Sequence, residues 1–286
     1  MGTSQSSDGP GAGVPMVPPW TPAAPQDPVP PAPPPAGEPE VPPADGVPAP
    51  PPAAPPAGVQ PPLLAPDRRF GGVRSSLGDF ARSGDGRDLR RGLGHYVRSG
   101  YGGANTATQR FGGTAQTAGS LGHALYSTAS GAADAPIDAA ALAGRSTEEI
   151  ATAIIEAVRP IDGTQDAEAE RAAIHDAMSE LLTEYPDADL LALSDAEREF
   201  VIERFSAIDV ARRFELDVGK HLLEKAATAT VAMARLKQMR SYIAETVAAS
   251  FRKLKDQGRT LTAGRVARVV QDALRETFEV FEGYEE

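Results

Sequence analysis

The N-terminus carries the group that is best suited to a chemical reaction. Removal of Met1, which the small next residue permits, leaves the α-amino group of Gly2 as the start of the chain. Such an amine titrates at about pH 7.7–8.0, so a useful fraction is neutral and nucleophilic near neutral pH. Gly2 has no side chain to obstruct it, and Thr3 and Ser4 are small and polar. The sequence therefore offers an accessible amine at its tip.

The usual signatures of an enzyme are missing from the rest of the sequence. Without cysteine there are no disulfides, thiolate metal sites or cysteine nucleophiles. Gly219-Lys220 lacks the flanking residues of a phosphate-binding loop, and neither a dinucleotide fingerprint nor a nucleophile elbow occurs. The four histidines stand in no zinc or di-iron spacing. We therefore expect a protein that is not an enzyme and has no metal or cofactor.

Residues 1–66 are predicted to form a disordered, proline-rich arm that displays this amine. The segment contains 24 of the 27 prolines, no Lys or Arg, and few large apolar residues. Such a composition cannot bury enough surface to offset the entropy of ordering. Its proline runs favour an extended polyproline II spacer.

Residues 67–145 form a Gly/Arg-rich segment with a net charge of +4, between acidic flanking segments. Apolar residues recur at three- and four-residue steps, which predicts short helices. Their glycines cost about 1 kcal/mol each relative to alanine, so we expect marginal helices that become stable against a partner or the C-terminal domain. Gly100-Tyr101-Gly102-Gly103 predicts a helix end.

Residues 146–286 are predicted to form a helical bundle domain. Ser146 with Glu149, and Ser194 with Glu197, have the spacing of capping boxes at helix starts. Another helix is expected over residues 166–185. The wide apolar stripe on the helix after Ser194 indicates a globular core rather than a coiled coil.

The longest helix is predicted from Val218 to about Lys255, where one face stays apolar throughout. A last helix follows, with Thr260 or Thr262 as its cap, and residues 281–286 are expected to be an acidic, fraying tail. The predicted fold class is all-α: an antiparallel bundle of about five helices, preceded by the weakly helical segment and the disordered arm.

Two motifs give this chain a family resemblance. Met1-Gly-Thr-Ser4 stands at the start of a proline-rich arm that contains Val17-Pro-Pro-Trp20. Further on, the stretch Gly92-Leu-Gly-His-Tyr-Val-Arg-Ser-Gly-Tyr-Gly-Gly103 follows. Together these features resemble the QatB family, whose members are components of bacterial Qat anti-phage systems.

The resemblance implies that the protein works beside a QueC-like enzyme, a KAP-type P-loop ATPase and a TatD-like nuclease, and is not itself the catalyst. In related systems the QueC-like enzyme is thought to join a deazaguanine group to the N-terminal glycine of a partner, which would make Gly2 the acceptor. The expected partner-binding residues lie in the two motifs. They are Thr3, Ser4, Trp20, Gly94, His95, Tyr96, Arg98, Gly100 and Tyr101.

Two other functions remain open. Arginines and aromatic residues interleave over residues 68–110, as in a nucleic-acid-binding adaptor, although four nearby aspartates and the absence of lysine weigh against it. Alternatively, the arm is a structural scaffold that engages proline-binding grooves. A bacterial cytoplasmic location is expected, because no signal peptide or run of about 18 apolar residues is present.

Overall fold

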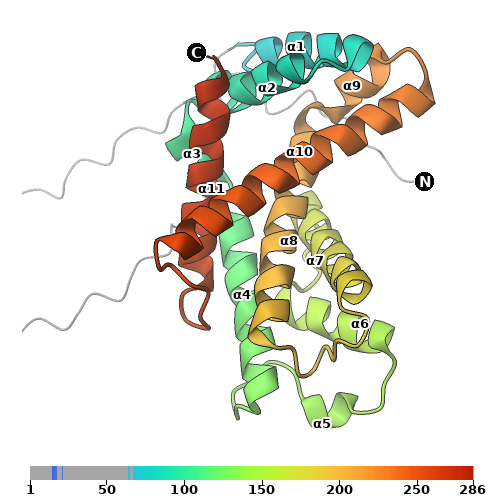
Figure 1. The fold of residues 1–286 in the computed structure, drawn as a ribbon, viewed down its shortest axis with the longest axis vertical. Helices are drawn as coiled ribbons and strands as arrows, with labels where there is room; N and C mark the ends of the chain where they lie inside the picture. The colour runs from blue at the N-terminus through green and yellow to red at the C-terminus, as the bar shows by residue number, and fades with distance from the viewer. Residues whose placement is uncertain (1–14, 18–20, 22–63, 65–66, 286) are drawn as a thin grey trace, which may run out of the picture.

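The computed structural model describes residues 15–17, 21, 64 and 67–285, and Figure 1 shows their arrangement. Within these residues every regular element is a helix, and one isolated antiparallel bridge pairs Pro15 with Leu64. The all-α fold class is therefore confirmed. Most of the arm, with its predicted disorder, lies outside the described residues. The α-helices are α1 (Gly71–Ser83), α2 (Gly86–His95), α3 (Ala104–Arg110), α4 (Gly112–Ser130), α5 (Ala139–Leu142), α6 (Thr147–Val158), α7 (Gln165–Glu184), α8 (Asp195–Phe214), α9 (Lys220–Lys225), α10 (Ala229–Asp256) and α11 (Val266–Glu282).

Both predicted capping boxes are present, at the starts of α6 and α8. The backbone N–H of Glu149 donates to Oγ of Ser146 at 3.3 Å, and its carboxylate accepts from the Ser146 N–H at 2.9 Å. Ser194 and Glu197 make the same reciprocal pair. These bonds satisfy backbone donors that a helix start leaves without an intrahelical partner, which is why the two boundaries could be located from sequence.

The predicted long helix over residues 218–255 is wrong in its first third. A π-helical turn, Glu215–Gly219, continues from α8 into α9, and the chain is extended at Ala226 before α10 begins. The Thr228 side chain accepts from the N–H of Val231 and caps α10. Because threonine can satisfy backbone donors at a new helix start, it allows a break that the apolar pattern does not reveal.

The C-terminal end also differs from the prediction. Helix α11 begins at Val266 without a side-chain cap, so neither Thr260 nor Thr262 has the predicted role. Phe281, expected in a fraying tail, is 1% exposed. The Tyr242 and Tyr284 hydroxyls hydrogen-bond at 2.6 Å and join α10 to the end of the chain. Aromatic packing therefore fixes this end up to Tyr284.

Helix α4 lies at the centre of the molecule, with α11 and α8 beside it (Figure 1). Two glycines bring α4 and α11 into close contact. A Cβ at Gly119 would lie 2.9 Å from the Ala267 Cβ, and one at Gly122 would lie 2.6 Å from a methyl group of Val266. A larger side chain at either position would push the helices apart. Glycine thus permits contact here although it weakens the isolated helix.

The first helices belong to the same hydrophobic core as the later ones. Buried apolar side chains form one cluster that extends from Phe70 to Phe281. Helix α1 packs against α2 and α9, while α2 and α3 pack against α11. In Figure 1 the α1–α2 hairpin lies at the top, near the C-terminal end of α11. This packing supplies the support that the glycine-rich helices need.

Candidate functional site

Residues Gly92–Gly103 form a sharp change of direction, which we name the motif corner. It comprises the end of α2, a π-helical turn (Tyr96–Gly100) and the loop into α3. Gly100 is buried, and a Cβ there would lie 2.7 Å from a ring carbon of Phe70. Gly102 and Gly103 have φ angles of +73° and +110°, which other residues rarely adopt. The glycines of the motif therefore serve a tight turn and close packing.

Two tyrosines of the motif corner donate hydrogen bonds to the same carboxylate oxygen. Oη of Tyr96 lies 2.8 Å from Oδ2 of Asp217, and Oη of Tyr101 lies 2.6 Å from it. Burial raises the pKa of Asp217, although both hydroxyl donors oppose the shift. Burial and the adjacent carboxylate raise the pKa of each tyrosine above its usual value. The tyrosines are thus protonated donors at neutral pH.

Arg69 places a buried positive charge beside this cluster. The residue is 5% exposed, and none of its guanidinium nitrogens has a hydrogen-bond partner among the residues that the structure describes. Its Cζ lies 4.4 Å from the ring centroid of Phe70 and 5.2 Å from that of Tyr101. The charge also lowers the pKa of Asp217, as a minor effect. Arg69 is therefore stabilised by aromatic faces and by a nearby carboxylate.

The described part of the arm reaches the same corner. Met16 is 5% exposed, and its sulfur lies 3.3 Å from the position that a Cβ on Gly102 would occupy. Next to it, Pro15 pairs with Leu64 from the other end of the proline-rich segment. Segments about fifty residues apart in sequence thus meet at the motif corner.

A charged cavity of about 410 Å³ lies between α3, α4, α7 and α8, and Thr21 of the arm is one of its lining residues. Its centre is Arg213, which pairs with Glu170 at 2.5 Å and with Asp209 at 3.0 Å. Arg159 also pairs with Glu170, at 2.6 Å. Other lining residues are polar: Arg110, Gln116, Thr117, Asp162, Thr164, Gln165 and Asp166.

The charged groups that line this cavity shift one another's pKa values. Burial alone would lower the pKa of Arg213, but three carboxylates, first Asp209, raise it above its usual value. Burial raises the pKa of Glu170 despite its arginine partners. Burial would also raise the pKa of Asp166, but Arg213 and Arg110 bring it below its usual value. The cluster is a mutually compensated ionic network.

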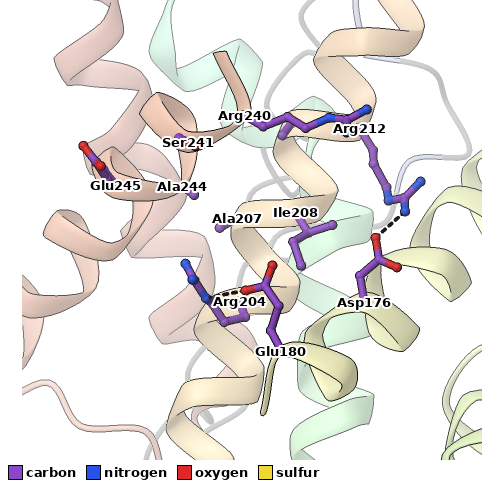
Figure 2. A pocket seen from close by; sticks show the side chains of 11 residues that line it. Asp176, Glu180, Arg204, Ala207, Ile208, Arg212, Arg240, Ser241, Ala244 and Glu245 are labelled. Carbon is purple, nitrogen blue, oxygen red and sulfur yellow. Dashed lines mark hydrogen bonds and ion pairs between the residues drawn. The ribbon is translucent and has the colours of Figure 1, made fainter. Parts of the chain in front are cut away.

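A separate surface groove of about 350 Å³ lies between α7, α8 and α10 (Figure 2). Ala207, Ile208 and Ala244 contribute apolar surface to it. Two ion pairs mark one side, Arg212 with Asp176 at 2.5 Å and Arg204 with Glu180 at 2.7 Å. Small apolar residues and charged side chains therefore share the lining of this groove.

The structure brings together only some of the predicted partner-binding residues. Gly2, Thr3, Ser4 and Trp20 lie outside the described residues. The others share the motif corner but differ in exposure. Arg98 is exposed and His95 is half-buried, whereas Gly94, Tyr96, Gly100 and Tyr101 are buried. Their role in binding partners stays a prediction, and Arg98 and His95 are the ones a partner could touch directly.

The aromatic residues of the 68–110 stretch do not form a nucleic-acid surface. Phe70, Phe80, Tyr96 and Tyr101, together with Phe111 directly after the stretch, are each at most 2% exposed. Stacking on bases requires accessible rings, so this part of the nucleic-acid interpretation is wrong.

Three of the six exposed arginines of the same stretch pair with aspartates. Arg82 pairs with Asp79 at 2.5 Å, and Arg91 pairs with Asp88 at 3.5 Å, each within one helix turn. Arg87 likewise pairs with Asp85. A phosphate backbone would have to compete with these carboxylates. The nucleic-acid alternative is therefore not favoured by the geometry.

Sequence reasoning missed the polar residues at the centre of both clusters. Asp209 and Arg213 stand at i and i+4 within the apolar stripe of α8, and both are buried. Two oppositely charged residues at core-facing positions of one helix could have been used to predict a buried ion pair from the sequence. Asp217 gave no comparable signal, because it belongs to a π-helical turn that changes the register of the helix.

No helix among the described residues is long and apolar enough to cross a membrane. In the same part of the chain, no group of three or more His, Asp or Glu side chains has the arrangement of a metal site.

Comparison with known proteins gives one family match. A family model described as Qat anti-phage system associated protein QatB matches residues 102–281, which is more than half of the chain. No curated protein and no solved structure matches the chain. The matched region begins at Gly102, the glycine beside Met16, and includes the groove of Figure 2 and every lining residue of the charged cavity except Thr21. The chain therefore belongs to the QatB family of Qat anti-phage system associated proteins.

Proposed function

We propose that this protein acts in Qat defence as a modification substrate and docking partner, and not as a catalyst. Membership of the QatB family makes it a component of a Qat anti-phage system. The acceptor in this proposal is the α-amine of Gly2, and the enzyme is the QueC-like member of the system. The KAP-type ATPase and the TatD-like nuclease are the other expected partners.

The observation that carries the proposal is the position of Met16. It is buried beside Gly102, in the region shared with the family, while Gly2 lies fourteen residues earlier in the sequence. A fully extended chain of that length spans at most about 50 Å. The amine can therefore enter the active site of a second protein while the helical body remains docked outside.

The helical body supplies surfaces for that docking. The groove between α7, α8 and α10 combines apolar residues with charged flanks, as in protein interfaces (Figure 2). The charged cavity is less suitable, since its lining contains no aliphatic or aromatic residue. We assign docking to the groove and modification to the N-terminus.

The test is the mass of the N-terminal peptide after expression with and without the QueC-like partner. We expect a peptide that lacks Met1 and carries the added group only when the partner is active. Gly2→Leu is the matched control, because a large second residue keeps Met1 in place and removes the acceptor. An unmodified Gly2 amine under conditions in which the system is active would contradict the proposal.

A further inference from the structure

We infer that Met16 is an anchor that fixes the arm to the motif corner and thereby sets the reach of the N-terminus. The consequence for Gly2 rests on the proposed function, whereas the anchor itself does not. Without an anchor, the whole segment before Asp67 would separate Gly2 from the helical body. An extended polyproline chain of that length spans about 200 Å. Anchoring at Met16 shortens the maximum reach to about 50 Å.

The contact between Met16 and Gly102 has the features of a specific fit. Met16 is nearly as buried as the core residues, and its sulfur and methyl carbon lie 3.3 and 3.5 Å from the Cβ position of Gly102. A side chain at Gly102 would occupy this space and would also be strained at φ +73°. Methionine suits such a site because its unbranched thioether adapts to irregular gaps.

Two further contacts of the arm lie close to the contact of Met16 with Gly102. Pro15 pairs with Leu64 in an antiparallel bridge, so both ends of the proline-rich segment meet beside Met16. Five residues after Met16, Thr21 lines the charged cavity with Arg110 and Arg213. The described arm residues thus follow one path, from Gly102 toward the start of α4.

The chain offers a clean way to measure this anchor, because it has no cysteine of its own. Cysteines introduced at Ser7 and at the exposed Ser99 of the motif corner can carry a fluorescent donor and acceptor. Ser7 lies nine positions before Met16, so these two residues are at most about 30 Å apart. If release of Met16 also releases its neighbours Pro15 and Thr21, the connecting segment of about sixty residues gives an average distance of about 45 Å or more.

The deciding variant is Met16→Asp, which places a charge in the buried contact. With a dye pair whose half-transfer distance is about 30 Å, matched to the anchored chain, we expect the transfer efficiency to fall to less than half of the wild-type value. Met233→Asp is the matched control, because Met233 is 58% exposed on α10. It should leave the efficiency unchanged. Circular dichroism of each variant checks that the helices remain folded.

The single tryptophan gives a label-free version of the same test. Trp20 lies between Met16 and Thr21 in sequence and is the only tryptophan of the chain. Its fluorescence anisotropy should fall in Met16→Asp and stay unchanged in Met233→Asp. Equal transfer efficiency and equal anisotropy in wild type and Met16→Asp would overturn the anchor. If the anchor is confirmed while Gly2 remains unmodified, only the proposed modification fails.

Discussion

The motif corner and the charged cavity enclose carboxylates in opposite ways. At the corner, Asp217 accepts from two neutral tyrosine hydroxyls. In the cavity, Asp209 and Glu170 face the guanidinium group of Arg213. The first arrangement depends on hydrogen bonds and on protonated tyrosines, whereas the second depends on balanced charge. The two clusters should therefore respond differently to substitution and to pH, although one hydrophobic core contains both.

The largest effect is expected for Arg213→Met. This change leaves Asp209 buried with the Thr114 hydroxyl as its remaining hydrogen-bond donor among the described residues, and it removes one partner of Glu170. An uncompensated buried charge costs about 3–5 kcal/mol. Urea unfolding should show this loss as a lower midpoint.

Arg213→Lys is the control for this substitution, because it keeps the positive charge but loses the forked geometry of the guanidinium group. It should be less harmful than Arg213→Met. If both variants were within about 1 kcal/mol of wild type, charge balance would not be what stabilises the cavity.

Asp217→Ala tests the corner by the same measurement. It leaves the buried hydroxyls of Tyr96 and Tyr101 without their acceptor, and one such group costs about 1–3 kcal/mol. We expect the total loss of unfolding free energy to lie near the middle of that range. Asp217 is only partly buried, so a water molecule can take the place of its carboxylate as the acceptor. Asp217→Asn retains an acceptor oxygen and should cost less. An equal loss in both variants would show that the ionised carboxylate, rather than an acceptor, is required.

Gly100→Ala disturbs the corner without touching its polar groups. The added methyl group would meet the Phe70 ring at 2.7 Å, so the ring must shift. Overpacking of this kind costs about 1–3 kcal/mol, and we expect the lower end because only one ring edge is involved. Gly86→Ala is the matched control, since nothing lies within 4 Å of its Cβ position. Thermal unfolding should show a lower midpoint for Gly100→Ala only.

The smallest effect is a pH dependence on the alkaline side. The pKa of Tyr101 is raised in the folded protein, so the unfolded chain releases this proton first and stability falls as pH rises above about 10. At pH 10.5 the loss is about 0.8 kcal/mol for one such tyrosine. Tyr101→Phe should remove this pH-dependent loss, because phenylalanine has no proton to release. The difference in unfolding free energy between wild type and variant should therefore shrink from pH 8 to pH 10.5. A constant difference would contradict the raised pKa.

Much of the fold could be predicted because local signals decided it. The capping boxes at Ser146 and Ser194 located two helix starts, and Pro160 and Pro186 follow the ends of α6 and α7. The break at Ala226–Thr228 was missed, since alanine-rich sequence favours a continuous helix and the cap of Thr228 was not recognised.

The candidate site was harder to predict, because it depends on contacts between distant segments. The glycine motif drew attention to the corner, but the partners of its tyrosines come from residue 217 and the guanidinium group beside them from residue 69. Periodicity shows which face of a helix is buried, not what it meets there. Met16 was likewise hidden, because the few apolar residues among the prolines around it form no periodic pattern.

The close contact of α4 with α11 has a consequence for how the protein is made. The glycine face of α4 is covered by Val266 and Ala267, about 145 residues later in the chain. A ribosome therefore releases the central helix long before its cover is synthesised, and contacts of such long range form slowly. A nascent chain that stops before α11 leaves this face of α4 exposed to water. The packing of the early helices is therefore completed only when the last helix has been synthesised.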